Sequence, residues 1–218
     1  MFVPLYTADA LVLRTYKLGE ADRIVVFLTR DRGKKRGVAK GARRPRSRFM
    51  GALEPLTEVR VAYFERERRE LVGLNYAETQ RSPLSLGNPE ALGHVGYFAE
   101  LLDEWAQEAD ADDRLYRLGA SMLDAMAAGA PIDALARYFE YWLLRLQGVY
   151  PESRGSLSEG AVAFLASARA VSPQHVGLMP TPPQVLKELE NVHRNLIATH
   201  LEKTLKSDRV LRDLRRHA

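Results

Sequence analysis

Cysteine is absent from the 218-residue chain, which excludes disulfides, thiolate metal ligands and a cysteine nucleophile. The sequence also lacks the run of roughly 18 to 20 apolar residues that a transmembrane helix needs. Its N-terminus has no basic stretch followed by an apolar segment, as a secretory signal peptide would have. These absences predict a soluble protein that acts in the cytoplasm without a membrane partner.

Motifs of the common enzyme classes are missing too. No Ser or Thr follows a Gly-Lys pair as in a P-loop, and neither G-x-G-x-x-G, G-x-S-x-G nor H-E-x-x-H occurs. His193 and His200 lie seven residues apart on a predicted helix. Because no acidic cluster stands at metal-ligand spacing from them, we expect both histidines to be solvated. The sequence therefore predicts no catalytic centre, no metal site and no cofactor.

Carboxylates are missing from residues 32–48, RGKKRGVAKGARRPRSR, which contain nine lysines and arginines. Residues 1–80 hold 17 basic and 10 acidic residues, a net charge of +7, whereas the rest of the chain has −3. Such a density of like charge repels itself unless a polyanion binds, and guanidinium groups pair well with phosphate oxygens. We predict that nucleic acid binds to Lys34, Lys35, Arg36, Lys40, Arg43, Arg44, Arg46 and Arg48.

Aromatic side chains that could stack on bases are harder to assign. Phe27, Phe49, Tyr63, Phe64 and Tyr76 lie in or beside predicted strands, where alternation should bury about half of them. Phe49 lies in the basic loop itself. We therefore expect Phe49 to be exposed and to stack on a base.

Hydrophobic periodicity divides the chain into a β-rich and a helical part. Alternation and turn residues predict five short strands at 8–14, 23–29, 35–40, 56–64 and 71–76. Helical spacing predicts helices at 90–108, 114–128, 131–148, 157–170 and 183–206, the third apolar on more than one face. The expected fold class is α+β, with a five-stranded oligonucleotide-binding (OB) barrel over residues 1–80 and an all-helical domain over 81–218.

Several segments carry a family resemblance. The order ALVLRTYKLGEADRIVVFLT, DRGKKRGVAKGARRPRSRF and GALEPLTEV resembles the N-terminal domain of the RecO family of bacterial recombinational-repair proteins. Residues 138–151, YFEYWLLRLQGVYP, are similar to the family's central helix, and HLEKTLKSDRVLRDL, with Lys206 and Ser207, is similar to its closing helix. These pieces span nearly the whole chain in the family's order.

The resemblance implies a non-enzymatic mediator of DNA repair and recombination in the bacterial cytoplasm, at the nucleoid. Family members bind single- and double-stranded DNA, anneal strands coated with single-strand-binding protein, and work with RecR to load the RecA recombinase. The family's basic barrel surface corresponds to the eight cationic residues named above.

One departure from the family concerns zinc. Many relatives carry two C-x-x-C pairs just after the positions of Gly148 and Pro151, whereas the equivalent stretch here, near 148–180, has no cysteine. One histidine cannot replace four thiolates, so we predict no zinc.

Other interpretations of the residues remain open. The barrel could bind structured RNA, or the basic loop could bind an acidic partner protein. The basic residues near the C-terminus could meet an acidic tail, extend the DNA surface or simply be solvated; they are Lys203, Lys206, Arg209, Arg212, Arg215 and Arg216.

Overall fold

The structure is a computed structural model that describes residues 4–66, 69–86, 89–108, 110–151 and 157–217. The chain forms two compact units, Met1–Ser85 with Phe98–Ala120, and Leu86–Tyr97 with Ser121–Ala218. The domain boundary after residue 80 stays a prediction.

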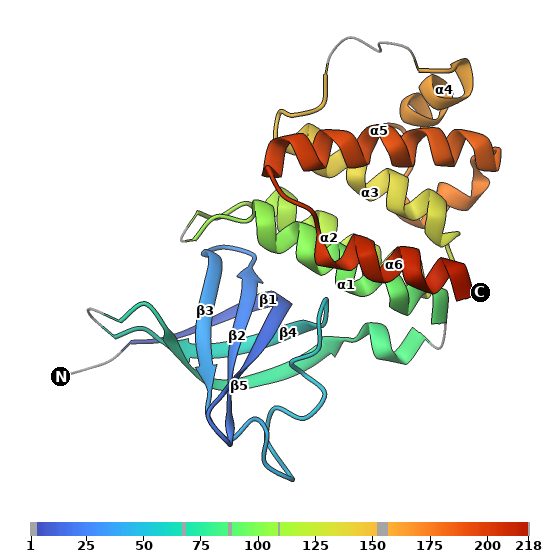
Figure 1. Ribbon diagram of the computed structural model, residues 1–218. Helices are drawn as coiled ribbons and strands as arrows, with labels where there is room; N and C mark the ends of the chain where they lie inside the picture. The colour runs from blue at the N-terminus through green and yellow to red at the C-terminus, as the bar shows by residue number, and fades with distance from the viewer. Residues whose placement is uncertain (1–3, 67–68, 87–88, 109, 152–156, 218) are drawn as a thin grey trace. The chain divides into compact units, whose positions relative to one another are not determined.

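Five strands of the first unit form a closed barrel in the order β1-β2-β3-β5-β4 (Figure 1). Their bounds are β1 Leu5–Leu18, β2 Asp22–Thr29, β3 Gly33–Ala39, β4 Glu58–Phe64 and β5 Val72–Arg81. All neighbouring pairs are antiparallel except β3 and β5. The predicted five-stranded barrel followed by helices is confirmed.

Alternating side chains fill the interior of the barrel, as the pleat of a strand requires. Ala8, Ala10 and Val12 on β1 face the same core as Phe27 on β2 and Tyr63 on β4. The rings of Phe27 and Tyr63 meet edge to face, with their centroids 5.8 Å apart. Burial raises the pKa of Tyr63 to about 12. Phe27 and Tyr63 are therefore core residues that no base can reach.

The barrel closes at a short parallel seam between β3 and β5. Only two residue pairs form it, Gly37 with Val72 and Val38 with Gly73. Glycine is required at position 37 because a Cβ atom there would lie 2.1 Å from Cδ1 of Leu74. The seam is thus tight but short, and β5 continues beyond it as a partner of β4.

Two helices contribute residues to the first unit, α1 (Pro89–Trp105) and α2 (Asp113–Ala127). The Cα atom of Gly119 on α2 lies so close to the side chains of Leu11 and Leu102 that a Cβ would approach each to 2.7 Å. Helix α2 also donates a hydrogen bond to β4, from the Tyr116 hydroxyl to Glu58, over 2.6 Å.

The second unit is helical and contains α3 (Ile132–Leu146), α4 (Glu159–Ala168), α5 (Pro183–Leu201) and α6 (Lys206–His217). Short 3-10 turns occur at Pro83–Leu86 and Pro173–Leu178. Helix α3 packs against both α4 and α5 and buries 11 of its residues. Helix α3, predicted to be apolar on more than one face, is thus largely buried within its unit.

The predicted single helix over 183–206 is wrong. Helix α5 ends at Leu201 because Glu202 adopts a left-handed conformation with φ 52°, and α6 begins only at Lys206. Lys203 consequently lies in the connector and not on the final helix. The side chains of Arg212, Arg215 and Arg216 lie outside the described part of the chain.

Three hydrogen bonds fasten α4 and the residues after it to α3. The indole of Trp142 donates to the carbonyl of Ala168 over 3.0 Å, and the Tyr138 hydroxyl donates to the carbonyl of Val171 over 3.2 Å. Arg169 donates to the hydroxyl of Tyr141. Within the segment predicted to correspond to the zinc region, 152–156 lie outside the described residues. None of the described helices is long and apolar enough to cross a membrane.

Candidate nucleic-acid interface

Two of the eight predicted contact residues are already paired with acidic groups. The ammonium of Lys34 lies 2.6 Å from the carbonyl oxygen and 3.4 Å from a carboxylate oxygen of Asp103. The ammonium of Lys35 lies 2.8 Å from the carboxylate of Glu65. Because these pairs satisfy both lysines, their net attraction for phosphate is weakened.

The other six cations are exposed and form no ion pair with a carboxylate among the described residues. They lie on β3 and on the connector that follows it, at Arg36, Lys40, Arg43, Arg44, Arg46 and Arg48. Six of the eight predicted residues are thus exposed on β3 and the connector, and their charges are not neutralised by an ion pair among the described residues. We call these six residues the basic surface.

The connector between β3 and β4, residues 40–57, is an ordered chain of turns. The amide of Gly41 donates to a carboxylate oxygen of Asp22 over 2.7 Å, and the amide of Arg43 donates to the carbonyl of Ala21 over 2.9 Å. The Arg43 guanidinium donates to the carbonyl of Gly19 over 2.8 Å. These bonds hold the connector against the turn between β1 and β2, so the basic surface has a defined geometry.

The prediction that Phe49 is exposed is wrong. Its side chain is 2% exposed and packs in the barrel core with Ala52 and Leu53. The connector returns to the barrel at this point, and burying the ring stabilises the fold more than solvent exposure would. Base stacking by Phe49 is incompatible with this geometry. The neighbouring Arg48 lies over the Phe49 ring, with its Cζ 5.1 Å from the ring centroid.

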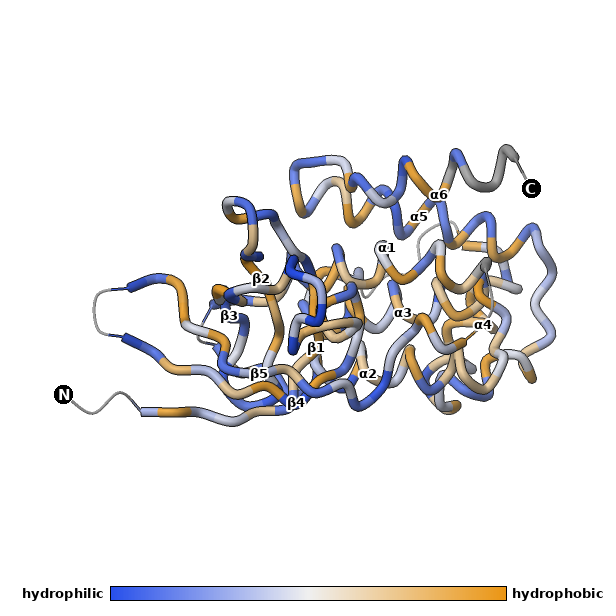
Figure 2. Tube along the Cα trace, turned by 90° about the horizontal axis from the view of Figure 1, so that it is seen from below, coloured by the Kyte–Doolittle hydropathy of each residue, from blue (hydrophilic) through white to orange (hydrophobic). Residues whose placement is uncertain are grey.

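A groove of about 570 Å³ lies beside the seam of the barrel. Its lining comes from β3, the connector, and both ends of the turn between β4 and β5: Val38, Lys40, Arg48, Phe64, Arg66, Arg69, Glu70, Leu71, Val72, Gly73 and Leu74. Figure 2 shows hydrophilic segments on both sides of that turn and hydrophobic segments within the strands. We call this feature the seam groove.

Sequence reasoning missed Arg66 and Arg69, because Glu65 to Glu70 reads as a turn whose opposite charges cancel. In the structure Glu65 pairs with Lys35, and Arg66 and Arg69 line the groove together with Lys40 and Arg48. The expected barrel could have indicated these arginines, because β5 lies next to β3 in this strand order and the turn that precedes β5 therefore adjoins β3.

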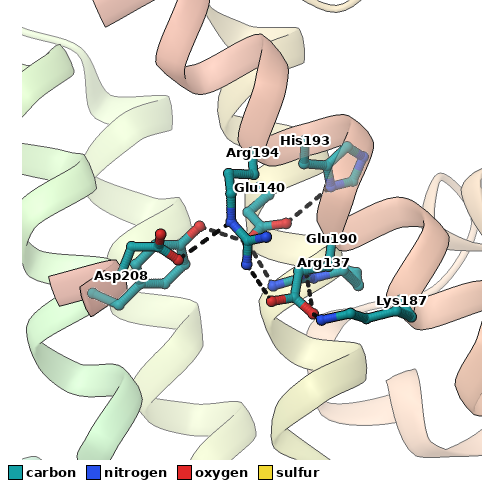
Figure 3. A network of polar contacts seen from close by, with 8 residues as sticks. Arg137, Glu140, Lys187, Glu190, His193, Arg194 and Asp208 are labelled. Carbon is teal, nitrogen blue, oxygen red and sulfur yellow. Dashed lines mark hydrogen bonds and ion pairs between the residues drawn. The ribbon is translucent and has the colours of Figure 1, made fainter. Parts of the chain in front are cut away.

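A buried polar network in the second unit was also missed (Figure 3). His193 is fully buried, and its Nδ1 lies 3.0 Å from the carboxylate of Glu140. The same carboxylate accepts hydrogen bonds from Tyr97 over 2.6 Å and from Arg137 over 2.7 Å. The prediction that His193 is solvated is therefore wrong, whereas His200 is exposed.

The network has the character of a structural core and not of a metal centre. Burial raises the pKa of Glu140, but the charge of Arg137 and the hydrogen bond with His193 lower it more, so the net shift is downward. No group of three or more potential metal ligands occurs among the residues that the structure describes.

Comparison with known proteins agrees with the fold. Residues 1–83 match the family described as Recombination protein O N terminal, and residues 86–174 match Recombination protein O C terminal. The DNA repair protein RecO of Koribacter versatilis (strain Ellin345) is 43% identical over 150 residues, which cover 68% of this chain and 61% of that relative.

Two further relatives bear the same description. The protein of Anaeromyxobacter sp. (strain K) is 40% identical over 65% of this chain and 56% of its own length. The protein of Pelotomaculum thermopropionicum is 29% identical over 93% of this chain and 92% of its own length. The matches to the first two relatives thus span less than two thirds of those proteins. From the two matched family regions and these relatives, the chain belongs to the RecO family.

Proposed function

We propose that this protein is a non-enzymatic mediator of DNA repair and recombination that binds single- and double-stranded DNA through its basic surface. The observation that carries the proposal is the presence of six exposed cations on β3 and the following connector, without carboxylate partners among the described residues. Phosphate backbones are the polyanions that such a surface attracts most strongly. The printed names of the relatives, DNA repair protein RecO, support DNA as the ligand.

Annealing of complementary strands requires no bond chemistry from the protein. Two single strands repel each other through their phosphates, and an ordered cationic surface lowers that repulsion while counterions are released. The connector holds Arg43 and Arg44 on its exposed side, where a guanidinium can pair with two phosphate oxygens. We further propose that the protein acts at the bacterial nucleoid on strands coated by single-strand-binding protein, and that it cooperates with RecR to load RecA.

The proposal is tested by annealing of complementary strands pre-coated with single-strand-binding protein. The charge reversals Arg43→Glu and Arg44→Glu together should reduce both DNA binding and annealing. Lys35→Gln is the matched control, because Lys35 lies in the same basic segment but is already paired with Glu65. Undiminished annealing by the double variant would instead favour an adaptor that uses the basic surface for an acidic protein.

Competition between a single-stranded DNA and a folded RNA of equal length tests the choice of nucleic acid. We expect the DNA to displace the RNA from the wild-type protein. A preference for the RNA would contradict the proposal and would favour an RNA-binding barrel.

A further inference from the structure

The seam groove combines an apolar floor with a cationic rim. The floor contains Val38, Phe64 and Leu74, and the rim contains Lys40 and Arg48 on one side. Arg66 and Arg69 line the groove from the β4–β5 turn, against the carboxylate of Glu70. Among the described lining residues, four cations stand against one carboxylate, which fits an anionic ligand, and the apolar floor fits a flat apolar group.

The glycine opposite Phe64 leaves room for its ring against the β5 backbone. A Cβ atom on Gly73 would lie 2.4 Å from Cε2 of the Phe64 ring, so only glycine allows the ring to approach the β5 backbone this closely. The ring also lies within 6.0 Å of the guanidinium carbon of Arg66, measured to its centroid. Phe64 is partly exposed, unlike Phe27, Tyr63 and Phe49. It is therefore an aromatic surface beside cations and in contact with solvent.

Unpaired nucleotides have the two properties that this groove matches. Their phosphates suit the cationic rim, and their bases suit an aromatic floor, because any base presents a flat face for stacking. Paired bases inside a duplex keep their faces stacked on one another and cannot enter. The basic surface, by contrast, offers charge alone and accepts either form of DNA.

We propose that the seam groove binds unpaired bases of a single nucleic-acid strand, with Phe64 as the stacking platform. This inference rests on the proposed function and deepens it. The groove gives the protein a preference for exposed single strands that charge attraction alone would not supply. Lys40 and Arg48 belong both to the basic surface and to the groove, so a strand bound on the basic surface can pass directly into the groove.

The test compares an oligo-dT strand with an abasic strand of the same length and charge. The wild-type protein should bind oligo-dT about tenfold more tightly than the abasic strand, because the abasic strand lacks the base that would stack on Phe64. Phe64→Leu keeps an apolar side chain in the floor. It should reduce the ratio of the affinity for oligo-dT to the affinity for the abasic strand to about one. Tyr16→Leu is the matched control, because Tyr16 is an exposed aromatic residue on β1 that does not line the groove; its ratio should stay at the wild-type value.

The outcomes separate this inference from the proposed function. Equal ratios for the wild type and Phe64→Leu, with both strands still bound, would overturn the base-binding groove and leave the basic surface intact. Failure of the wild-type protein to bind either strand would overturn the proposed function itself.

A second measurement needs no substitution and so does not depend on the folding of a variant. A strand that carries 5-iododeoxyuridine is cross-linked by light to the wild-type protein, which is then digested with trypsin. We expect the label on the peptide VAYFER, residues 61–66, which contains Phe64. Labelling confined to other peptides would contradict the inference.

Discussion

His193 and Glu140 form a buried contact of 3.0 Å between an imidazole nitrogen and a carboxylate oxygen, joining α5 to α3. Side-chain exposure is 0% for His193 and 2% for Glu140. The hydroxyl of Tyr150 lies 3.3 Å from the other ring nitrogen of His193, and Arg137 pairs with Glu140 from one turn earlier on α3. The polar groups at the centre of the helical unit therefore bond mainly to one another, although Nε of Arg137 is buried without a hydrogen-bond partner among the described residues.

Replacing Glu140 by leucine should destabilise the protein by about 3 to 5 kcal/mol, because the buried charge of Arg137 would lose its closer carboxylate partner and keep only Glu190, 3.9 Å away. The measurement is urea-induced unfolding followed by circular dichroism. Glu202→Gln changes an exposed carboxylate in the connector after α5 and should alter the free energy of unfolding by less than about 0.5 kcal/mol. If Glu140→Leu behaved like this control, the network would have no role in stability.

The same carboxylate should make stability depend on pH. Burial raises the pKa of Glu140, but Arg137 and His193 lower it more, so the folded protein has a lower pKa than the unfolded chain. Ionised Glu140 therefore adds stability above the ordinary glutamate pKa of about 4.3, and this contribution is lost as the pH falls through the lowered pKa. The free-energy difference between the wild type and Glu140→Gln should be constant near neutral pH and should shrink below about pH 4. A difference that grows on acidification would contradict the downward shift.

The strands could be predicted from the sequence because each depends on a local pattern, such as the alternation of Val59, Val61 and Tyr63. His193 could not be placed, because its partner Glu140 is 53 residues away and neither residue stands out in its own helix. Phe49 was misplaced for a related reason, since the course of the connector back to the barrel depends on tertiary packing.

The basic surface was predictable as a charged segment but not as a set of free charges. Lys34 and Lys35 are paired by Asp103 and Glu65, two residues that adjoin them only in the folded barrel unit. The break between α5 and α6 was missed because Glu202 carries no helix-ending signal of its own, whereas glycine at this left-handed position would have predicted it.

The salt dependence of DNA binding should report how many cations contact phosphate. If about five of the six residues of the basic surface do so, log affinity for a single strand should fall against log salt with a slope near −3.5. Arg43→Gln with Arg44→Gln should reduce the magnitude of that slope by about 1.4. Lys35→Gln should leave it unchanged, since Lys35 is neutralised by Glu65. An unchanged slope in the double variant would remove Arg43 and Arg44 from the contact surface.

Two helical glycines should respond in opposite directions to the same substitution. Gly119→Ala should destabilise the protein by about 1 to 3 kcal/mol, because its Cβ would lie 2.7 Å from the side chains of Leu11 and Leu102, both fully buried. Gly96→Ala is the matched change on α1, where a Cβ meets nothing within 4 Å, and should stabilise by about 0.5 to 1 kcal/mol. Thermal unfolding of both variants provides the measurement. Stabilisation by Gly119→Ala would show that α2 does not pack this closely on the barrel.

The attachment of α4 to α3 should depend on side-chain hydrogen bonds and not on a metal ion. The indole of Trp142 donates to the carbonyl of Ala168 over 3.0 Å. Trp142→Phe removes that donor and should lower the free energy of unfolding by about 1 kcal/mol, because the carbonyl is left with one partner fewer. Treatment with a strong chelator should leave the melting temperature of the wild type unchanged, and elemental analysis should find no stoichiometric zinc. One equivalent of zinc, or a melting temperature that falls on chelation, would show that this chain holds the region with a metal after all.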